Sequence, residues 1–361
     1  MSTALRRSVG ELMIVGVSGK ELTAVERAWL RVVRPAGVIL FRRNIESAEQ
    51  TRALLEAATS ECSEIAFRFV DVEGGLVDRL KDALAPMPSA KAVYATHSRQ
   101  LWHRHGALIG EAVAAFGFNT TLAPVVDLAL PVSEPVMQTR STTENPEEVA
   151  AYAAEFLAGL ASKHVSGCAK HFPGLGGGTL DSHLATPSIE RSLREMWQQD
   201  MIPYRRLAAQ LPMVMVSHAA YPKTAGKNFP ASISRWWITK ILKEKIGYKG
   251  LVISDDLEMG GILNHACIED AAVGSIEAGM HLIEICHSEE LILRAFESLL
   301  SRAERSSGFR NLLVARAKEA TQLRHRAIGK QIRPAISATG IAKLRERIKS
   351  FSVQVAARTK L

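Results

Sequence analysis

The sequence predicts a single-domain (β/α)8 barrel, because strand-like and helix-like segments alternate along most of the chain and polar residues follow the strand-like ones. The expected strands are mostly continuous apolar runs, which is typical of parallel strands buried on both faces. At 361 residues with 47% hydrophobic side chains, the chain is long enough to bury one large barrel core. The eight expected strands are Leu12–Val17, Gly37–Phe41, Ile65–Val72, Thr120–Leu128, Val165–His171, Met213–His218, Gly250–Asp255 and Met280–Cys286.

Helical segments lie between these strands. The clearest is expected to begin after Asn145, a capping residue that is followed by Pro146 and by carboxylates in the first turn, and to run to Leu160. Further helices are expected at Ala107–Phe116 and Leu193–Ala208.

Polar residues lie at the ends of the second to seventh expected strands. In a (β/α)8 barrel the carboxyl ends of the strands form the face that carries the chemistry, so these side chains are expected to converge on one rim. They are Arg42, Arg43, Asn44, Asp71, Glu73, Asp127, Lys170, His171, His218, Asp255 and Asp256.

The segment from Lys170 to His183 has the composition of a site. An apolar run delivers Lys170 and His171 to a strand end, and a glycine-rich loop then carries Asp181 and His183. Burying a lysine and a histidine is costly unless polar groups bind them, and the spacing Asp-x-His can direct a carboxylate at an imidazole. The alternative is that Lys170 and His171 form a surface pair and that the loop is an ordinary connection.

The seventh expected strand ends in two carboxylates, Asp255 and Asp256. Strand alternation directs one of them into the barrel mouth. With a proton donor on the loop after the fifth strand, such a carboxylate suits glycoside cleavage. The alternative is that both residues cap the following helix.

The net charge of +8 is a property of the C-terminal segment. From Ser301 to Leu361 there are 15 Lys and Arg against 3 Asp and Glu, which leaves a net charge of −4 on the preceding residues. An anionic partner such as nucleic acid or a membrane surface is one interpretation. Because no aromatic residues interleave the charges, we favour solvated terminal helices and expect no nucleic-acid partner. We expect a barrel over residues 1–300 and a basic, helical extension over 301–361.

Cysteine usage and hydropathy indicate a soluble protein of a reducing compartment. Cys62, Cys168, Cys267 and Cys286 are scattered without metal-ligand or disulfide spacing and are expected to be core residues. No apolar run approaches the roughly 18 residues that a membrane span needs, so we expect a cytoplasmic protein. The histidines lack metal-ligand spacing, so no metal is expected.

Six segments in a fixed order resemble glycoside hydrolase family 3, and within it the single-domain β-N-acetylglucosaminidases of the NagZ type. The resemblance covers roughly Ser8 to Leu300. The segments are Gly37–Asn44, Val70–Gly75, Leu122–Asp127, Lys170–His183, Pro230–Ser234 and Ile253–Met259.

The resemblance implies a role for each matching residue. Asp255 matches the nucleophile that forms a covalent glycosyl-enzyme, His183 matches the general acid/base, and Asp181 matches the residue that orients this histidine. An imidazole suits acid/base work because its ordinary pKa lies near the operating pH. The sugar-binding positions of the family match Asp71, Arg79, Arg140, Lys170 and His171, which would hold the sugar by charge-assisted hydrogen bonds.

The chain departs from the family pattern at three positions. Leu76 replaces the usual arginine of Glu-Gly-Gly-Arg, and Leu175 replaces the usual histidine of Phe-Pro-Gly-His-Gly. Both changes remove a polar group near the mouth. His281 stands where an aspartate is common, and we interpret it as structural.

The resemblance implies a retaining exo-hydrolase without a cofactor that removes terminal β-linked N-acetylglucosamine from cytosolic cell-wall turnover fragments. Two alternatives stay open. The same machinery would suit a β-glucosidase or a glycoside phosphorylase, and a non-catalytic sugar-binding homologue would tolerate Leu76 and Leu175. The sequence does not indicate the oligomeric state.

Overall fold

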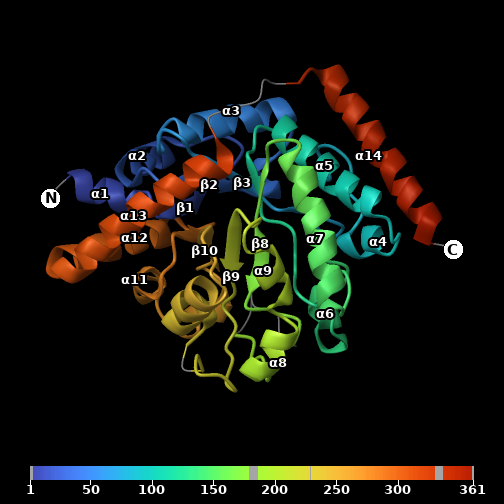
Figure 1. The fold of residues 1–361 in the computed structure, drawn as a ribbon. Coiled ribbons are helices and arrows are strands. Elements are labelled where there is room, and N and C mark those ends of the chain that lie inside the picture. The colour runs from blue at the N-terminus through green and yellow to red at the C-terminus, as the bar shows by residue number, and fades with distance from the viewer. Residues whose placement is uncertain (1–2, 179–185, 228, 330–335, 360–361) are drawn as a thin grey trace.

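A closed barrel of parallel strands forms the centre of the protein (Figure 1). The computed structural model describes residues 3–178, 186–227, 229–329 and 336–359. The strands of the barrel are β1 (Met13–Gly16), β2 (Gly37–Leu40), β3 (Phe67–Val70), β6 (Thr120–Thr121), β7 (Ser166–Gly167), β8 (Ala169–Phe172), β9 (Met213–Val216), β10 (Leu251–Asp256) and β11 (Leu282–Ile285). A separate two-stranded antiparallel unit consists of β4 (Val72–Gly74) and β5 (Val77–Asp78).

The barrel closes through a divided strand. The strand order is β7-β6-β3-β2-β1-β11-β10-β9-β8, so β7 and β8 lie at the two ends of the sheet. These two strands are successive pieces of one stretch, separated by Cys168 alone, and a bridge between Val125 and Lys170 lies beside them. β7 pairs with β6 and β8 pairs with β9, which joins the two edges. The expected (β/α)8 fold is therefore confirmed, with the fifth expected strand shared between β7 and β8.

Helices surround the barrel (Figure 1). The α-helices are α1 (Thr3–Gly10), α2 (Ala24–Val33), α3 (Ala48–Thr59), α4 (Ala90–Tyr94), α5 (Arg99–Ala115), α6 (Glu134–Met137), α7 (Pro146–Ala161), α8 (Leu193–Gln198), α9 (Ile202–Leu207), α10 (Gly260–Leu263), α11 (Ile268–Ala278), α12 (Glu289–Arg305), α13 (Ser307–Ile328) and α14 (Ala338–Thr359). Short 3₁₀ turns are η1 (Arg42–Asn44), η2 (Pro131–Ser133) and η3 (Ala231–Ile233), and η4 (Trp236–Lys245) is a π-helix.

Of the three expected helices, one is confirmed, one is longer than expected and one is divided. The helix expected over Ala107–Phe116 is α5, which begins earlier, at Arg99. α7 begins as expected, because the Asn145 side chain accepts hydrogen bonds from the backbone of Glu147 and Glu148. The single helix expected over Leu193–Ala208 is wrong, since α8 and α9 are separate there. Pro203 has no backbone N–H to donate and is accommodated in the first turn of α9, so the chain starts a new helix instead of continuing the first.

Strand alternation fills the barrel with apolar side chains and places polar ones above them. One cluster of buried apolar residues, contributed mainly by the strands, fills the inside of the barrel, and we call it the inner core cluster. It includes Phe67 and Phe69 of β3 and Leu251 and Ile253 of β10. The next residues on the same faces, two positions towards the carboxyl end, are Asp71 and Asp255. The polar residues of the rim therefore follow directly after the inward-facing apolar residues of the same strands.

The described part of the C-terminal segment is helical and packs on the barrel. α13 contacts α1 and α12, and a buried ion pair joins Arg324 to Glu11 at 2.5 Å. α14 lies beside α4 and α5, as Figure 1 shows, and buries Leu344, Ile348 and Phe351 among its apolar residues. Much of the basic charge is therefore carried on the solvent faces of docked helices.

All four cysteines are free. Cys62, Cys168 and Cys286 are buried as expected, but the expectation of a core position is wrong for Cys267, which is exposed at the start of α11. Among the described helices, none combines the length and the apolar character that crossing a membrane requires.

α5 and α7 approach each other closely through two glycines. A Cβ atom on Gly159 would lie 2.2 Å from the carbonyl oxygen of His103, and one on Gly106 would lie 2.0 Å from that of Phe156. Because backbone atoms are the obstacles, any side chain at either position would push the two helices apart.

We predict that Gly159→Ala lowers the free energy of unfolding by about 1–3 kcal/mol, as overpacking does. Gly308→Ala is the matched control, because Gly308 lies in α13 with no atom closer than 3.9 Å to its added Cβ. Helix propensity should make that control neutral or stabilising. Urea denaturation of wild type and both variants provides the measurement. If Gly159→Ala were as stable as wild type, the close contact between α5 and α7 would be contradicted.

Candidate active site

A cavity of about 410 Å³ lies at the carboxyl ends of the barrel strands. Its lining includes six of the residues that the sequence indicated as site residues: Asp71, Arg79, Arg140, Lys170, His171 and Asp255. The other two, Asp181 and His183, lie outside the described residues. The chain lines the cavity at Gly178 and again at Pro187, on either side of the segment that carries them.

Lys170 is the centre of a buried ion network. Its Nζ atom lies 2.9 Å from Asp71 Oδ1 and 2.8 Å from Glu73 Oε1. Arg140 donates two hydrogen bonds of 2.9 Å to the carboxylate of Glu73. Lys170 and His171 are 4% and 5% exposed, so the alternative of a surface pair is wrong. The peptide bond between them is cis.

The cations and carboxylates of this network keep one another ionised. Burial opposes the charged form of Glu73, but Arg140 and Lys170 outweigh it and hold its pKa well below the ordinary range. Burial likewise disfavours the charged form of Lys170, yet Asp71 and Glu73 raise its pKa above the ordinary value. The network therefore presents fixed charges to the cavity.

His171 is held in one orientation by Asp127. The imidazole Nδ1 lies 2.7 Å from Asp127 Oδ2, and the same carboxylate accepts the backbone N–H groups of His171 and Leu175. On the other side of the ring, Nε2 lies 3.5 Å from Arg140 Nη2, which can only donate. The short contact with the Asp127 carboxylate, which can only accept, shows that Nδ1 carries a proton and donates it to Asp127.

Arg79 retains donor capacity in the cavity. Its nearest carboxylate oxygen is Asp71 Oδ2 at 3.7 Å, and its buried Nε has no hydrogen-bond partner among the described residues. A buried N–H without a partner is rare and suits a ligand acceptor.

Asp255 ends the inner stripe of β10 and is partly exposed to the cavity. Burial opposes its ionisation, but His171, His218 and Lys170 outweigh this effect and lower its pKa. Its Oδ1 accepts the N–H of Asp256 at 3.0 Å, which fixes one oxygen. The capping alternative is wrong for α10, because the residue at its N-cap is Met259 and no side chain caps it.

His218 fixes the backbone that carries Asp255. Its Nε2 lies 2.9 Å from the carbonyl oxygen of Asp256, which can only accept, so Nε2 carries the proton. Nδ1 lies 2.7 Å from the Ser232 hydroxyl oxygen. Burial lowers the pKa of His218, and the charge of Asp255 opposes this effect.

The sequence interpretation missed two acidic or basic side chains of the cavity lining, Glu284 and His287. Both belong to the eighth expected strand or to its end, where no site residue was expected. The available signal for Glu284 was a carboxylate in the middle of the apolar run Met280–Cys286. Glu73 and Asp127 were recognised as polar strand ends but were given no role.

His287 lies between two carboxylates at the cavity rim. Its Nδ1 is 2.9 Å from Glu258 Oε2 and 3.4 Å from Asp256 Oδ2. Within the described ranges, this trio is the group of His, Cys, Asp and Glu residues whose ligand atoms lie close enough to hold a metal ion. A proton on His287 satisfies the same geometry as an ion pair. The expectation of no metal therefore stays a prediction.

The three departures from the family pattern have different surroundings. Leu175 lines the cavity, whereas Leu76 lies in the β4–β5 turn, is 51% exposed and is not among the lining residues. His281 is buried, accepts the backbone N–H of Val252 at Nδ1, and has its pKa lowered to about 4 chiefly by burial. Its contacts are those of a structural residue.

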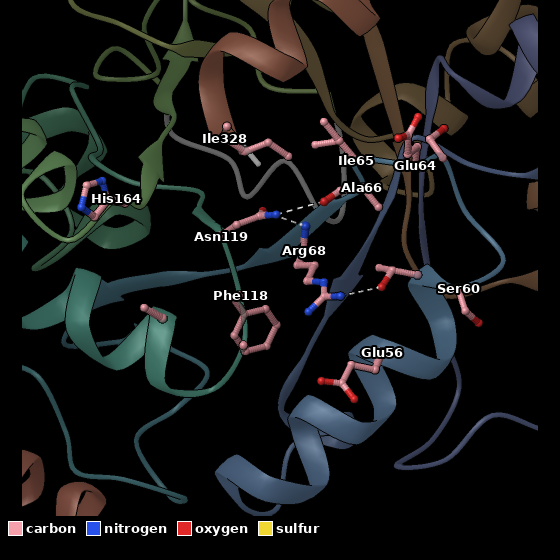
Figure 2. Close-up of a pocket in the computed structure, with 15 residues that line it drawn as sticks. Glu56, Ser60, Glu64, Ile65, Ala66, Arg68, Phe118, Asn119, His164 and Ile328 are labelled. Carbon is pink, nitrogen blue, oxygen red and sulfur yellow. Dashed lines mark hydrogen bonds between the residues drawn. The ribbon is translucent and has the colours of Figure 1, made fainter. Parts of the chain in front are cut away.

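A second hollow, of about 450 Å³, lies near the amino ends of strands (Figure 2). The Arg68 guanidinium donates a hydrogen bond to Thr59 Oγ1 at 2.9 Å. Figure 2 shows the Asn119 side chain bonded to the backbone of Arg68 and Ala66. These polar groups bond to other protein groups, so they have a structural role. In (β/α)8 enzymes the active site lies at the carboxyl ends of the barrel strands, so the cavity around Asp255 is the candidate active site.

The fold and this cavity define a class of protein, a (β/α)8 enzyme with a charged site for a small polar ligand. The chain belongs to glycosyl hydrolase family 3, because the model described as "Glycosyl hydrolase family 3 N terminal domain" matches residues 4–309. This membership confirms the family that the six sequence segments indicated.

Named relatives and solved structures agree with the family. A beta-hexosaminidase of Stenotrophomonas maltophilia is 34% identical over 309 residues, which cover 84% of this chain and 91% of the relative. A family 3 beta-N-acetylglucosaminidase from Paenibacillus has a TM-score of 0.86 at 28% identity, covering 97% of this chain and 69% of that one. NagZ from Neisseria gonorrhoeae, in complex with N-trifluoroacetyl-D-glucosamine, has a TM-score of 0.75 at 27% identity, covering 95% and 98%.

We predict that His287 titrates with a midpoint of about 9, because Asp256 and Glu258 raise its pKa from 6.5. Its stabilising effect is then complete below pH 6.5 and is lost as the pH rises through about 9. NMR titration of the imidazole measures the midpoint. Glu258→Gln should move it back towards 6.5, and a wild-type midpoint near 6.5 would contradict the ion pair.

Proposed function

We propose that this protein is a retaining exo-β-N-acetylglucosaminidase that uses Asp255 as its nucleophile. The observation that carries the proposal is the convergence of six separated sequence positions on one cavity. Each of the six matches a sugar-binding or nucleophile position of the family. The named activities of the relatives, beta-hexosaminidase and beta-N-acetylglucosaminidase, support the same conclusion.

Asp255 suits nucleophilic attack on an anomeric carbon. Its lowered pKa keeps it ionised, and its position above Ile253 places it in the cavity floor. In the first step, an Asp255 oxygen bonds to C1 while the C1–O bond to the leaving group breaks and a proton passes to the departing oxygen. In the second step, water attacks C1, gives up a proton and releases Asp255.

His183 would transfer these protons, with Asp181 orienting its ring. The support is the position of His183 in the sequence, between Gly178 and Pro187, which both line the cavity. Glycines at 176, 177 and 178 allow the backbone to approach the cavity closely. We further propose that this loop closes over bound sugar and completes the site.

Asp71, Arg79, Arg140, Lys170 and His171 would bind the glycon. Lys170 and Arg140 are held by carboxylates, so their positions are fixed before the sugar arrives. Arg79 has an unsatisfied donor. Fixed donors and acceptors around a polyol give charge-assisted hydrogen bonds without a large cost of reorganisation.

The natural substrate that we propose is a cell-wall turnover fragment carrying terminal N-acetylglucosamine, cleaved in the cytoplasm without a cofactor. We also propose the functional division expected from the sequence, with catalysis in residues 1–300 and a helical extension in 301–361. The docked helix α14 supports a structural role for this extension.

We predict that the purified protein hydrolyses a chromogenic β-N-acetylglucosaminide and that Asp255→Asn reduces kcat by about 10⁴-fold or more. A fluorinated N-acetylglucosaminide that slows the second step should label Asp255, as peptide mass spectrometry would show. A label on Glu73 or Asp256 would contradict the assignment. Faster turnover of a glucoside, or turnover that requires phosphate, would favour the two enzymatic alternatives, and inactivity on all these substrates would favour the non-catalytic one.

We predict that His183→Ala slows aryl glycosides with poor leaving groups by about 10²–10⁴-fold, because they need the proton in the transition state. Substrates with good leaving groups should lose much less in the first step. Kinetics with a series of substituted phenyl N-acetylglucosaminides measure this dependence. Equal losses across the series would argue against an acid role for His183.

A further inference from the structure

The cavity contains a carboxyl group that the proposed mechanism does not use, that of Glu284. Glu284 is 2% exposed and belongs to the cavity lining. Its Oε1 atom is buried and has no hydrogen-bond partner among the residues that the structure describes. An unpaired buried carboxyl oxygen costs free energy in the folded protein, so its retention needs a reason.

Strand geometry directs Glu284 into the barrel beside the nucleophile. Its neighbours at spacing two on the same strand, Leu282 and Cys286, both belong to the inner core cluster, so Glu284 shares their inward face. In the adjoining strand β10, Asp255 lies two positions beyond the inner residue Ile253. β11 pairs with β10 in parallel, with a register shift after Ile253 that sets Glu284 opposite Asp256, the residue next to Asp255. The carboxyl-bearing residues Glu284 and Asp255 both line the cavity.

Two cations of the cavity, Lys170 and Arg140, are already paired with other carboxylates. Lys170 bonds to Asp71 and Glu73, and Arg140 bonds to Glu73 through two of its nitrogens. Burial, followed by the charges of Asp71 and Asp255, raises the pKa of Glu284 well above its ordinary value. This shift favours the protonated form of Glu284, in which the carboxyl group has one proton to donate and lone pairs to accept.

We propose that Glu284 is a further substrate-binding residue, whose carboxyl group hydrogen-bonds a hydroxyl of the sugar that lies against Asp255. This inference rests on the proposed function. A neutral acid both donates and accepts, as a sugar hydroxyl does, so the pair is complementary without placing a second negative charge beside Asp255. A bound sugar would also satisfy the oxygen that has no protein partner.

Two substitutions at this position separate binding from packing. Glu284→Gln keeps the shape, a donor and an acceptor, whereas Glu284→Leu keeps only bulk. For Glu284→Leu we expect kcat/KM on a chromogenic N-acetylglucosaminide to fall about tenfold or more, the value of one lost hydrogen bond. The inhibition constant of free N-acetylglucosamine should rise in parallel, while Glu284→Gln should stay within about threefold of wild type.

The stability of the same variants provides a second readout. Because folding raises the pKa of Glu284, wild type should lose stability relative to Glu284→Gln as the pH rises above 4.5, the ordinary pKa. Melting curves at several pH values test this difference. Glu11→Gln is the matched control, since Glu11 is a buried glutamate paired with Arg324 outside the cavity. It should lower stability without changing kcat/KM.

The outcomes separate three roles. Unchanged kcat/KM and inhibition constant in Glu284→Leu would overturn the proposal in favour of packing alone. Equal losses in Glu284→Gln and Glu284→Leu would overturn it in favour of a carboxylate or a transferable proton, and so would losses that depend on the leaving group.

Failure of the proposed function would look different. Wild type would then leave N-acetylglucosaminides intact. A panel of monosaccharides tested by thermal shift on the wild type would still identify a bound sugar, and loss of that shift in Glu284→Leu but not in Glu284→Gln would support the role of Glu284. Retention of the shift in both variants would overturn it.

Discussion

The pairing of Lys170 with Asp71 and Glu73 is the interaction on which the site depends. A lysine at 4% exposure above an apolar core is tolerated because two carboxylates compensate its charge, since an isolated buried ion costs several kcal/mol. The three residues come from β8 and from the chain after β3, and Arg140 adds the loop before α7. The ion pairs around Lys170 thus join three segments that are distant in the sequence on one side of the cavity.

The balance between burial and nearby charges also explains why the pKa values of two carboxyl groups in one cavity shift in opposite directions. Asp255 lies within reach of two histidines and Lys170, so the anion is favoured even though burial opposes it. Glu284 is fully buried and close to other carboxylates, and Lys170 opposes these effects only weakly, so its pKa is raised and its protonated form is favoured. Environments that separate the pKa values of neighbouring acids are typical of enzyme sites, and here they suit one group for attack and the other for hydrogen bonding.

The sequence predicted the barrel and most of its rim because both follow from local patterns. Each of the eight expected strands overlaps at least one strand of the barrel. Asn145 fixed the start of α7 by capping its first turn with its side chain. The continuous helix expected over Leu193–Ala208 was wrong because Pro203 acts as the first turn of a new helix. The possibility of a surface pair at Lys170 and His171 could be dismissed only with the partners Glu73, Asp127 and Arg140 in view.

By itself, the sequence determined which residue types end each strand, because alternation and propensity act over a few neighbouring positions. It also determined the family, through six motifs in a fixed order. Tertiary structure decided the charge of each group, since Glu73, Asp255 and Glu284 are alike as isolated carboxyls and differ only in the cations and anions that the closed barrel brings near them. Electrostatic energy depends on distances across the barrel, and these distances do not exist until the ends of the sheet meet.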